Sequence, residues 1–162
     1  VWGIGCDASN EEAVAKIYAL KQREESKSMI CLMNGDKMMY HVFAKIPEVA
    51  WEILDHSERP TTLILDQPKN VAKNIIAEDN TLGIRIVKEP FCFKLMERMK
   101  RPLVSTSANI SGKPTPMNFK EISPEIIKGV DYVVNLHHDK VCKKPSAIIK
   151  LTLDSQVKVI RR

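Results

Sequence analysis

The chain has 162 residues, of which 44% are hydrophobic and 28% are charged, and it contains no long apolar run. These values predict one globular domain with a single core, and they exclude a membrane-spanning helix and a disordered tail. The formal net charge of +5 favours polyanion partners such as nucleotides or RNA, although an ordinary basic protein has the same balance. The four cysteines form no C-x-x-C pair, so we expect a reducing, cytoplasmic location rather than a disulfide scaffold.

The first half of the chain predicts two helices and two strands. Ser9 to Glu12 has the form of a capping box, and the apolar stripe behind it predicts a helix that ends at Lys21-Gln22-Arg23. A second helical stripe covers residues 46–54, with Pro47 in its first turn. Residues 28–33 and 61–65 are rich in residues that favour strands.

The second half predicts more strands than helices. Short helices are expected at 70–77, at 91–99 after Pro90, and at 125–128 before Gly129, while strands are expected at 82–87, 102–106, 132–136, 147–151 and 157–160. Because the last strands have no helices between them, a mixed sheet is favoured over a doubly wound parallel one. The fold class is therefore α/β or α+β, in one domain over residues 1–162.

Two segments could bind a phosphate or a nucleoside. Lys21 and Arg23 leave a helix end as a pair that can clamp phosphates, although cations are also common in last helical turns. The second segment runs from Ser105 to Gly112 and contains Ser107 and Asn109. Its hydroxyl, amide and backbone N–H groups suit a nucleotide beyond a strand end, although such residues are also the usual ones of a polar turn.

Three further side chains are candidates from their positions in strands. If Ile84 and Ile86 face the core, alternation sends Arg85 to the opposite face, where it binds a carboxylate or is solvated. Ser146 precedes the strand at 147–151, and Arg161 stands at the end of the last strand, followed by Arg162. Each of these would also pass as an ordinary surface residue.

Other patterns predict no site. The chain has neither the P-loop pattern nor G-x-G-x-x-G. His137-His138 and Cys142 have some character of metal ligands, but no further ligand is placed to complete a site.

Taken together and in this order, the segments resemble the YrdC/YciO-type family. The resemblance rests on Val1-Trp2-Gly3-Ile4-Gly5-Cys6-Asp7-Ala8, on Lys21-x-Arg23, on Gly83-Ile84-Arg85, on Thr106-Ser107-Ala108-Asn109-Ile110-Ser111-Gly112, on Pro145-Ser146-Ala147-Ile148-Ile149 and on Ile160-Arg161. It extends over the whole chain, and the pairing of K-x-R with S-x-N is its most specific element. The family opening resembles P-T-x-T-V-Y-G-L-G-x-D-A, so we expect an N-terminal strand and helix to precede Val1 in the family pattern.

The resemblance implies a twisted mixed sheet with flanking helices around a concave cleft. It also implies synthesis of threonylcarbamoyl-AMP, a nucleotidyl transfer in which ATP, L-threonine and bicarbonate react, with Mg²⁺ accompanying the ATP. The product would serve the t6A transferase machinery that modifies adenosine 37 of tRNA.

The resemblance also implies roles for individual residues. Lys21 and Arg23 match K-x-R and would act in catalysis on the ATP phosphates, while Ser107 and Asn109 match S-x-N and would bind the nucleotide. Arg161 would give another ATP contact. Arg85 and Ser146 would bind threonine, although Ala147 stands where the family has Thr.

Two alternatives stay open from the sequence. The chain could be a non-catalytic module whose basic cleft binds tRNA or double-stranded RNA. Its affinity for RNA would then fall as the salt concentration rises. A paralogue could instead make another carbamoyl-type adenylate. The presence of Ser107 and Asn109 favours the synthase, and no membrane partner is expected.

Overall fold

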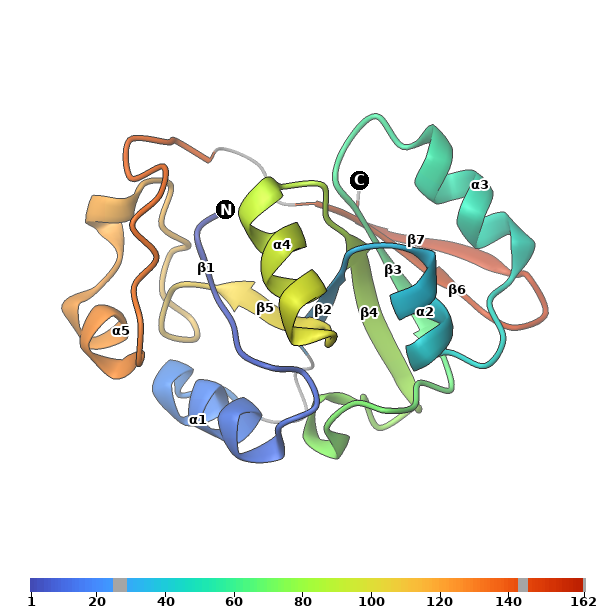
Figure 1. Cartoon of the computed structure of the whole chain (residues 1–162), viewed down its shortest axis with the longest axis horizontal. Coiled ribbons are helices and arrows are strands. Elements are labelled where there is room, and N and C mark those ends of the chain that lie inside the picture. The colour runs from blue at the N-terminus through green and yellow to red at the C-terminus, as the bar shows by residue number, and fades with distance from the viewer. Residues whose placement is uncertain (25–28, 143–145, 162) are drawn as a thin grey trace.

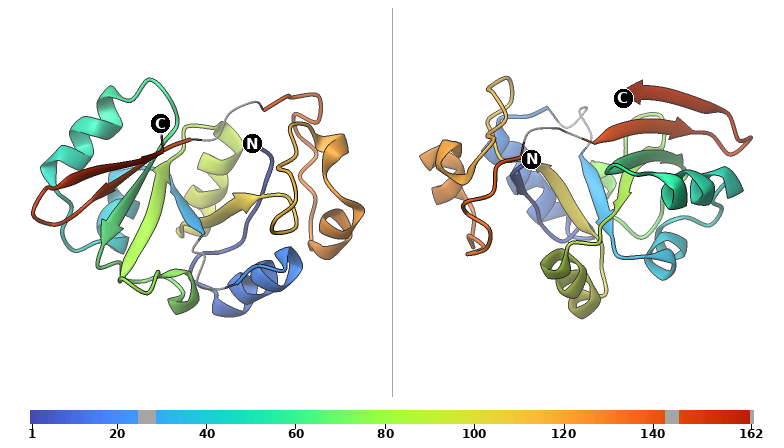
Figure 2. Two further views of the ribbon diagram at one scale, coloured as in Figure 1. Left: turned by 180° about the vertical axis from the view of Figure 1, so that it is seen from behind. Right: turned by 90° about the horizontal axis from the view of Figure 1, so that it is seen from above.

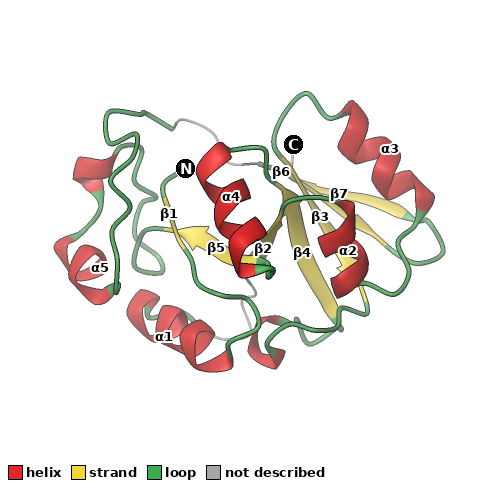
Figure 3. Cartoon of the chain, viewed as in Figure 1, coloured by secondary structure: helices red, strands yellow, loops and turns green. Residues whose placement is uncertain are grey.

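A computed structural model describes residues 1–24, 29–142 and 146–161. Its seven strands form one sheet in the order β1-β5-β2-β4-β3-β6-β7 (Figure 1). The strands are β1 (Gly3–Ile4), β2 (Ile30–Met33), β3 (Thr61–Asp66), β4 (Thr81–Ile86), β5 (Leu103–Ser107), β6 (Ala147–Leu151) and β7 (Val157–Arg161). The α-helices are α1 (Glu11–Lys21), α2 (Asp36–Val42), α3 (Glu48–His56), α4 (Pro90–Met99) and α5 (Pro124–Gly129), and 3-10 turns cover Lys73–Ile75 and Phe119–Glu121 (Figure 3).

The sheet is mixed, as the sequence predicted. Strand β2 pairs with β4 in parallel, and β3 pairs with β6 in parallel. The remaining neighbours, from β1–β5 to β6–β7, are antiparallel. Parallel neighbours need long crossovers, and the two sets of pairs therefore bring distant parts of the chain together.

The two faces of the sheet differ in burial. Cys31, Ile84 and Val104 lie side by side on one face and are almost fully buried. Helices α2, α3 and α4 contribute residues to this core, and Figure 2 shows α4 and α2 on the same side of the strands. The opposite face, which carries Leu32, Arg85 and Leu103 in one row, is only half-buried, and we call it the open face.

Three predicted elements were wrong. Asn10, not Ser9, caps α1, because the Asn10 side chain accepts from Ala13 N, while the Ser9 hydroxyl donates to Asp7 Oδ1. The helix expected at 70–77 is reduced to the 3-10 turn Lys73–Ile75. Residues 132–136 form no strand, and Tyr132 is 76% exposed, because strand propensity depends on pairing and packing that this segment does not have.

Helix α2 was not predicted from the sequence. This helix has only seven residues and no side-chain cap, because its N-cap is Gly35. Its Met38 and Met39 are buried in the core, as packing residues.

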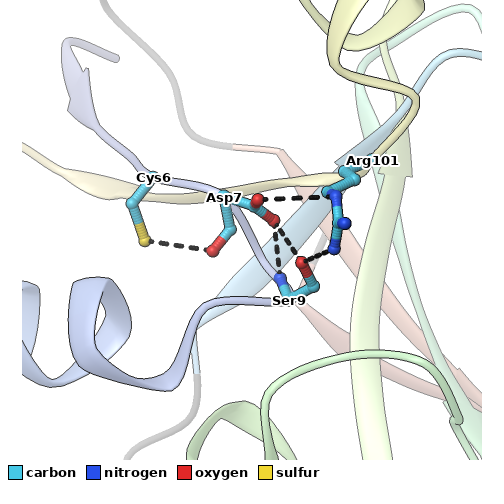
Figure 4. A network of polar contacts seen from close by, with 4 residues as sticks. All are labelled: Cys6, Asp7, Ser9 and Arg101. Carbon is cyan, nitrogen blue, oxygen red and sulfur yellow. Dashed lines mark hydrogen bonds and ion pairs between the residues drawn. The ribbon is translucent and has the colours of Figure 1, made fainter.

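A polar network fixes the turn between β1 and α1 (Figure 4). The Asp7 carboxylate accepts from Ser9 N at 2.8 Å and from Ser9 Oγ at 2.7 Å. Arg101 Nη1 donates to the same Ser9 hydroxyl at 2.5 Å, and Arg101 Nε lies 3.8 Å from Asp7 Oδ2. Because the turn leads directly into α1, this network helps to set the direction of the helix that ends at Lys21.

Gly5 is the glycine whose replacement should cost most stability. A Cβ at Gly5 would lie 2.2 Å from the backbone oxygen of Val104, and a strand backbone cannot move aside as a side chain can. Gly5→Ala should lower the free energy of unfolding by about 3 kcal/mol or more, at the upper end of single substitutions. Urea unfolding of Gly112→Ala is the control, since that Cβ meets nothing within 4 Å and a positive φ alone should cost about 1 kcal/mol. Equal losses in the two variants would contradict the close approach.

Candidate functional site

Lys21 ties the end of α1 to the loop after β5. Its side chain is buried, and Nζ donates to Ser107 O at 2.5 Å and to Asn109 O at 2.6 Å. In return, Ser111 N donates to Lys21 O at 2.7 Å. The structure therefore brings Lys21 against Ser107 and Asn109, which lie 86 and 88 residues later in the sequence, and we call the three residues the loop cluster.

The Lys21 ammonium keeps one donor for a ligand. An ammonium has three N–H groups, and the two carbonyls use two of them. Burial, and then the positive charge of Arg23, lower the pKa of Lys21 to about 8. Lys21 is therefore mostly charged at neutral pH but is poised to lose its proton in mildly alkaline solution.

This pKa gives a prediction on pH. Lys21 carries its charge below pH 8 and loses it above, so ATP binding should be about tenfold weaker at pH 9 than at pH 7, with its midpoint near 8. Isothermal titration calorimetry across this range checks it. Lys21→Met should flatten the profile, whereas Lys16→Met, an exposed lysine of the same helix, should keep it. A Lys21→Met protein with the unaltered profile would show that another group titrates.

Asn109 presents an acceptor. Its Nδ2 donates to Ile110 O at 3.0 Å and to Lys113 O at 2.7 Å, which fixes the orientation of the amide because a flipped oxygen would face two carbonyls. Asn109 Oδ1 is buried and has no hydrogen-bond partner among the described residues. Such an atom suits a ligand N–H or O–H group rather than a phosphate oxygen.

Arg23 follows the helix end directly. Gln22 closes α1 in the left-handed conformation, and Arg23 N donates to Tyr18 O at 2.9 Å. The positive charge of Arg23 contributes to the lowered pKa of Lys21. Arg23 therefore adds positive charge near the loop cluster.

A second cluster forms around Arg85. Its Nη2 donates to Ser146 Oγ at 2.7 Å, and both Nη2 and Nε approach Thr62 Oγ1, at 3.3 and 3.4 Å. The hydroxyls of Thr62 and Ser146 lie 2.9 Å apart, and Arg161 Nε donates to Ser146 O at 2.9 Å. We call Thr62, Arg85, Ser146 and Arg161 the arginine cluster; Thr62 was not predicted, because a threonine in a strand has no special sequence signal.

The arginine cluster suits an anion. Neither Arg85 nor Arg161 makes an ion pair with a carboxylate among the described residues. Burial, and then the charge of Arg161, lower the pKa of Arg85, so the two like charges are held near each other at an energetic cost. A bound carboxylate or phosphate would offset that cost and could accept from the guanidinium in a bidentate way.

The arginine cluster and the Ser107 side chain lie on the open face. The pairing places Arg85 beside Leu32 and Leu103, and Ser107 ends the same strand β5, with its side chain on the same face. This register separates Arg85 from Ser107 by about 13 Å along the strands and about 10 Å across them. Arg161, expected with the nucleotide residues, therefore lies in the arginine cluster and not beside Lys21.

Two cavities lie elsewhere. One of about 630 Å³ is lined by His41, Asn70, Lys100 and Arg101, and one of about 590 Å³ is lined by Asp7 and Glu11 among others. Both lie near the start of β5, whereas Ser107 stands at its end. Among the described residues, no group of three or more His, Cys, Asp or Glu side chains could hold a metal ion. None of the helices in the described ranges is long and apolar enough to cross a membrane.

Comparisons with known proteins agree with this geometry. The model of the Sua5/YciO/YrdC family, described as "Telomere recombination", matches residues 1–162. A protein of Methanocaldococcus jannaschii is 38% identical over 161 residues, which cover 98% of this chain and 74% of that protein. A threonylcarbamoyl-AMP synthase of Pseudoalteromonas translucida is 31% identical over 138 residues, covering 83% of this chain and 74% of that protein.

A solved structure has the same fold. The chain is similar to P. abyssi Sua5 complexed with L-threonine, with a TM-score of 0.79, 25% identity and coverage of 92% of this chain. It spans 44% of that Sua5 chain, so the longer protein contains parts without a counterpart here. The match over all 162 residues, the curated relatives and the shared fold together show that the chain belongs to the Sua5/YciO/YrdC family.

Proposed function

We propose that this chain synthesises threonylcarbamoyl-AMP from ATP, L-threonine and bicarbonate, for the t6A modification of adenosine 37 in tRNA. The observation that carries the proposal is the pair of clusters, one around Lys21 and Ser107 and one around Arg85 and Ser146, with the Ser107 and Arg85 side chains on the same face of the sheet. Relatives named threonylcarbamoyl-AMP synthase, and a Sua5 structure that binds L-threonine, support the same conclusion.

The chemistry proceeds in two steps. The threonine nitrogen bonds to the carbon of bicarbonate with loss of water, which gives an N-carboxylated amine. One oxygen of this carbamate then attacks the α-phosphorus of ATP, and the bond to the bridging oxygen breaks to release pyrophosphate. The protein must hold two anions close together and offset the charge that moves to pyrophosphate.

The loop cluster provides the nucleotide side of the site. Lys21 and Arg23 would contact the phosphates, with the third N–H of Lys21 as the donor. Ser107 would contact the nucleotide near its α-phosphate. Asn109 Oδ1 would accept from the base or from a ribose hydroxyl, since its amide hydrogens are already used.

The arginine cluster provides the amino-acid side. Arg85 and Ser146 would bind the threonine carboxylate. Arg161, which contacts Ser146 O, would add charge beside the same anion and toward the α-phosphate. In this proposal the amino acid and the nucleotide would bind at separate places on the side of the sheet that carries Arg85 and Ser107.

The remaining partners follow from the reaction. Mg²⁺ would enter with ATP as part of the substrate, held by phosphate oxygens and water. The product would pass to the transferase machinery that acts on tRNA. All four cysteines are unpaired, which fits a cytoplasmic protein.

Pyrophosphate release tests the proposal. The full-length protein should release pyrophosphate from ATP only when both L-threonine and bicarbonate are present. Release that requires a different carbamoyl-type substrate in place of threonine and bicarbonate would identify a paralogue that makes another carbamoyl-type adenylate. Failure of all conditions, together with salt-sensitive retention of RNA, would replace the synthase by an RNA-binding module.

A further inference from the structure

Thr62 is the most deeply buried residue of the arginine cluster and contacts both Arg85 and Ser146. It is 1% exposed, and its hydroxyl stands between Arg85 and Ser146. Strand β3 places it there, because Thr62 pairs with Ile148 of β6, close to Ser146. Because Thr62 is almost fully buried and its hydroxyl contacts both Arg85 and Ser146, packing limits the rotation of its side chain.

The distance between the two hydroxyls admits either one as the donor, and burial decides between them, because Thr62 is 1% exposed whereas Ser146 is 6% exposed. A guanidinium only donates, so both hydroxyl oxygens accept from Arg85. If Ser146 donated to Thr62, the buried Thr62 hydrogen would have no acceptor among the described residues, which is destabilising. Thr62 therefore donates to Ser146, and the hydrogen of Ser146 is left to point at a ligand.

We propose that Thr62 is a positioning residue that makes the arginine cluster a donor-only site, selective for a carboxylate over a carboxamide. The Ser146 oxygen already accepts from Thr62 and Arg85, so it has no acceptor capacity left for a ligand. Toward a ligand, the cluster offers the Ser146 hydrogen and the remaining N–H groups of two arginines. A carboxylate accepts at both oxygens, whereas an amide would direct its NH₂ at another donor. The inference rests on the proposed function, in which this carboxylate belongs to L-threonine.

Removal of the Thr62 hydroxyl tests the inference. Thr62→Val keeps the shape and should weaken L-threonine binding by about 10- to 100-fold, the loss expected for a hydrogen-bonded charged group, with ATP affinity changed less than about threefold. Thr62→Ser, which keeps the hydroxyl, should bind within about threefold of wild type. Calorimetry with L-threonine and with L-threoninamide reads out selectivity, which should decrease in Thr62→Val and be retained in Thr62→Ser.

The outcomes separate this inference from the proposed function. Unaltered preference for L-threonine in Thr62→Val overturns the role of Thr62, whether or not pyrophosphate is released. A wild-type protein that prefers the carboxylate but releases no pyrophosphate with threonine supports the site and refutes the synthase. If Thr62→Val does not fold, Ser146→Ala must lose the same selectivity, and retention of it overturns the inference. A wild-type protein that binds neither compound overturns it as well.

Discussion

Lys21→Met should reduce threonine-dependent pyrophosphate release by about 100-fold or more, the scale of losing one charge-stabilising donor at a reacting phosphate. Methionine keeps the length of the buried chain but removes the ammonium that lies between Ser107 O and Asn109 O. The two carbonyls lose a charged donor, so the variant should also be less stable by about 2 kcal/mol. Initial rates at several ATP concentrations, together with urea unfolding, measure both effects.

Lys16→Met is the matched control for this prediction. Lys16 is an exposed lysine of α1. Its replacement should change the free energy of unfolding, and the activation free energy of pyrophosphate release, by no more than about 0.5 kcal/mol. L-Threonine binding separates a local from a global effect, because the arginine cluster does not contact Lys21. Full activity in a folded Lys21→Met protein would remove Lys21 from the phosphate site.

Arg85→Lys should raise the KM for L-threonine by about 10- to 100-fold and leave the KM for ATP within about threefold. Lysine keeps the charge but cannot donate from two fixed nitrogens to Thr62 and Ser146, as Arg85 Nε and Nη2 do. The selective change in one KM is the informative result, since a general loss of structure would affect both substrates. Steady-state kinetics with each substrate varied in turn measures it.

Arg98→Lys, on the exposed surface of α4, is the matched control and should change neither KM. If Arg85→Lys raised the KM for threonine and the KM for ATP equally, Arg85 would act where both substrates react and would not be specific to the threonine carboxylate. An unchanged KM for threonine would show that threonine does not bind at the arginine cluster.

Features that depend on residues close together in the sequence, such as strand alternation and helix starts, could be predicted from the sequence. Alternation placed Arg85 opposite Ile84, and Ile84 is fully buried while Arg85 is half-buried on the open face. Pro90 marked the start of α4, where Glu89 caps the helix through Cys92 N. Both features follow from spacing along one segment.

Contacts between distant segments could not be predicted in this way. Ser9 had the right spacing for a cap, but a carboxylate two residues earlier already holds its hydroxyl, and the cap falls on Asn10. The buried position of Lys21 depends on carbonyls that lie 86 and 88 residues away. Thr62 gains its partners only through the pairing of β3 with β6 and β4.

The late position of β6 has a consequence for biosynthesis. Strand β3 pairs with β6 across 86 positions, from Thr61 to Ala147 (147 − 61 = 86), so this part of the sheet forms only when the end of the chain is available. During translation, which proceeds at roughly 5–20 residues per second, Lys21 and Ser107 can meet before Ser146 has been made. A nascent or truncated chain that stops before Ser146 would therefore leave β3 as an exposed edge, prone to pair with other chains. Under the proposed function, the nucleotide side of the site would therefore form before the amino-acid side.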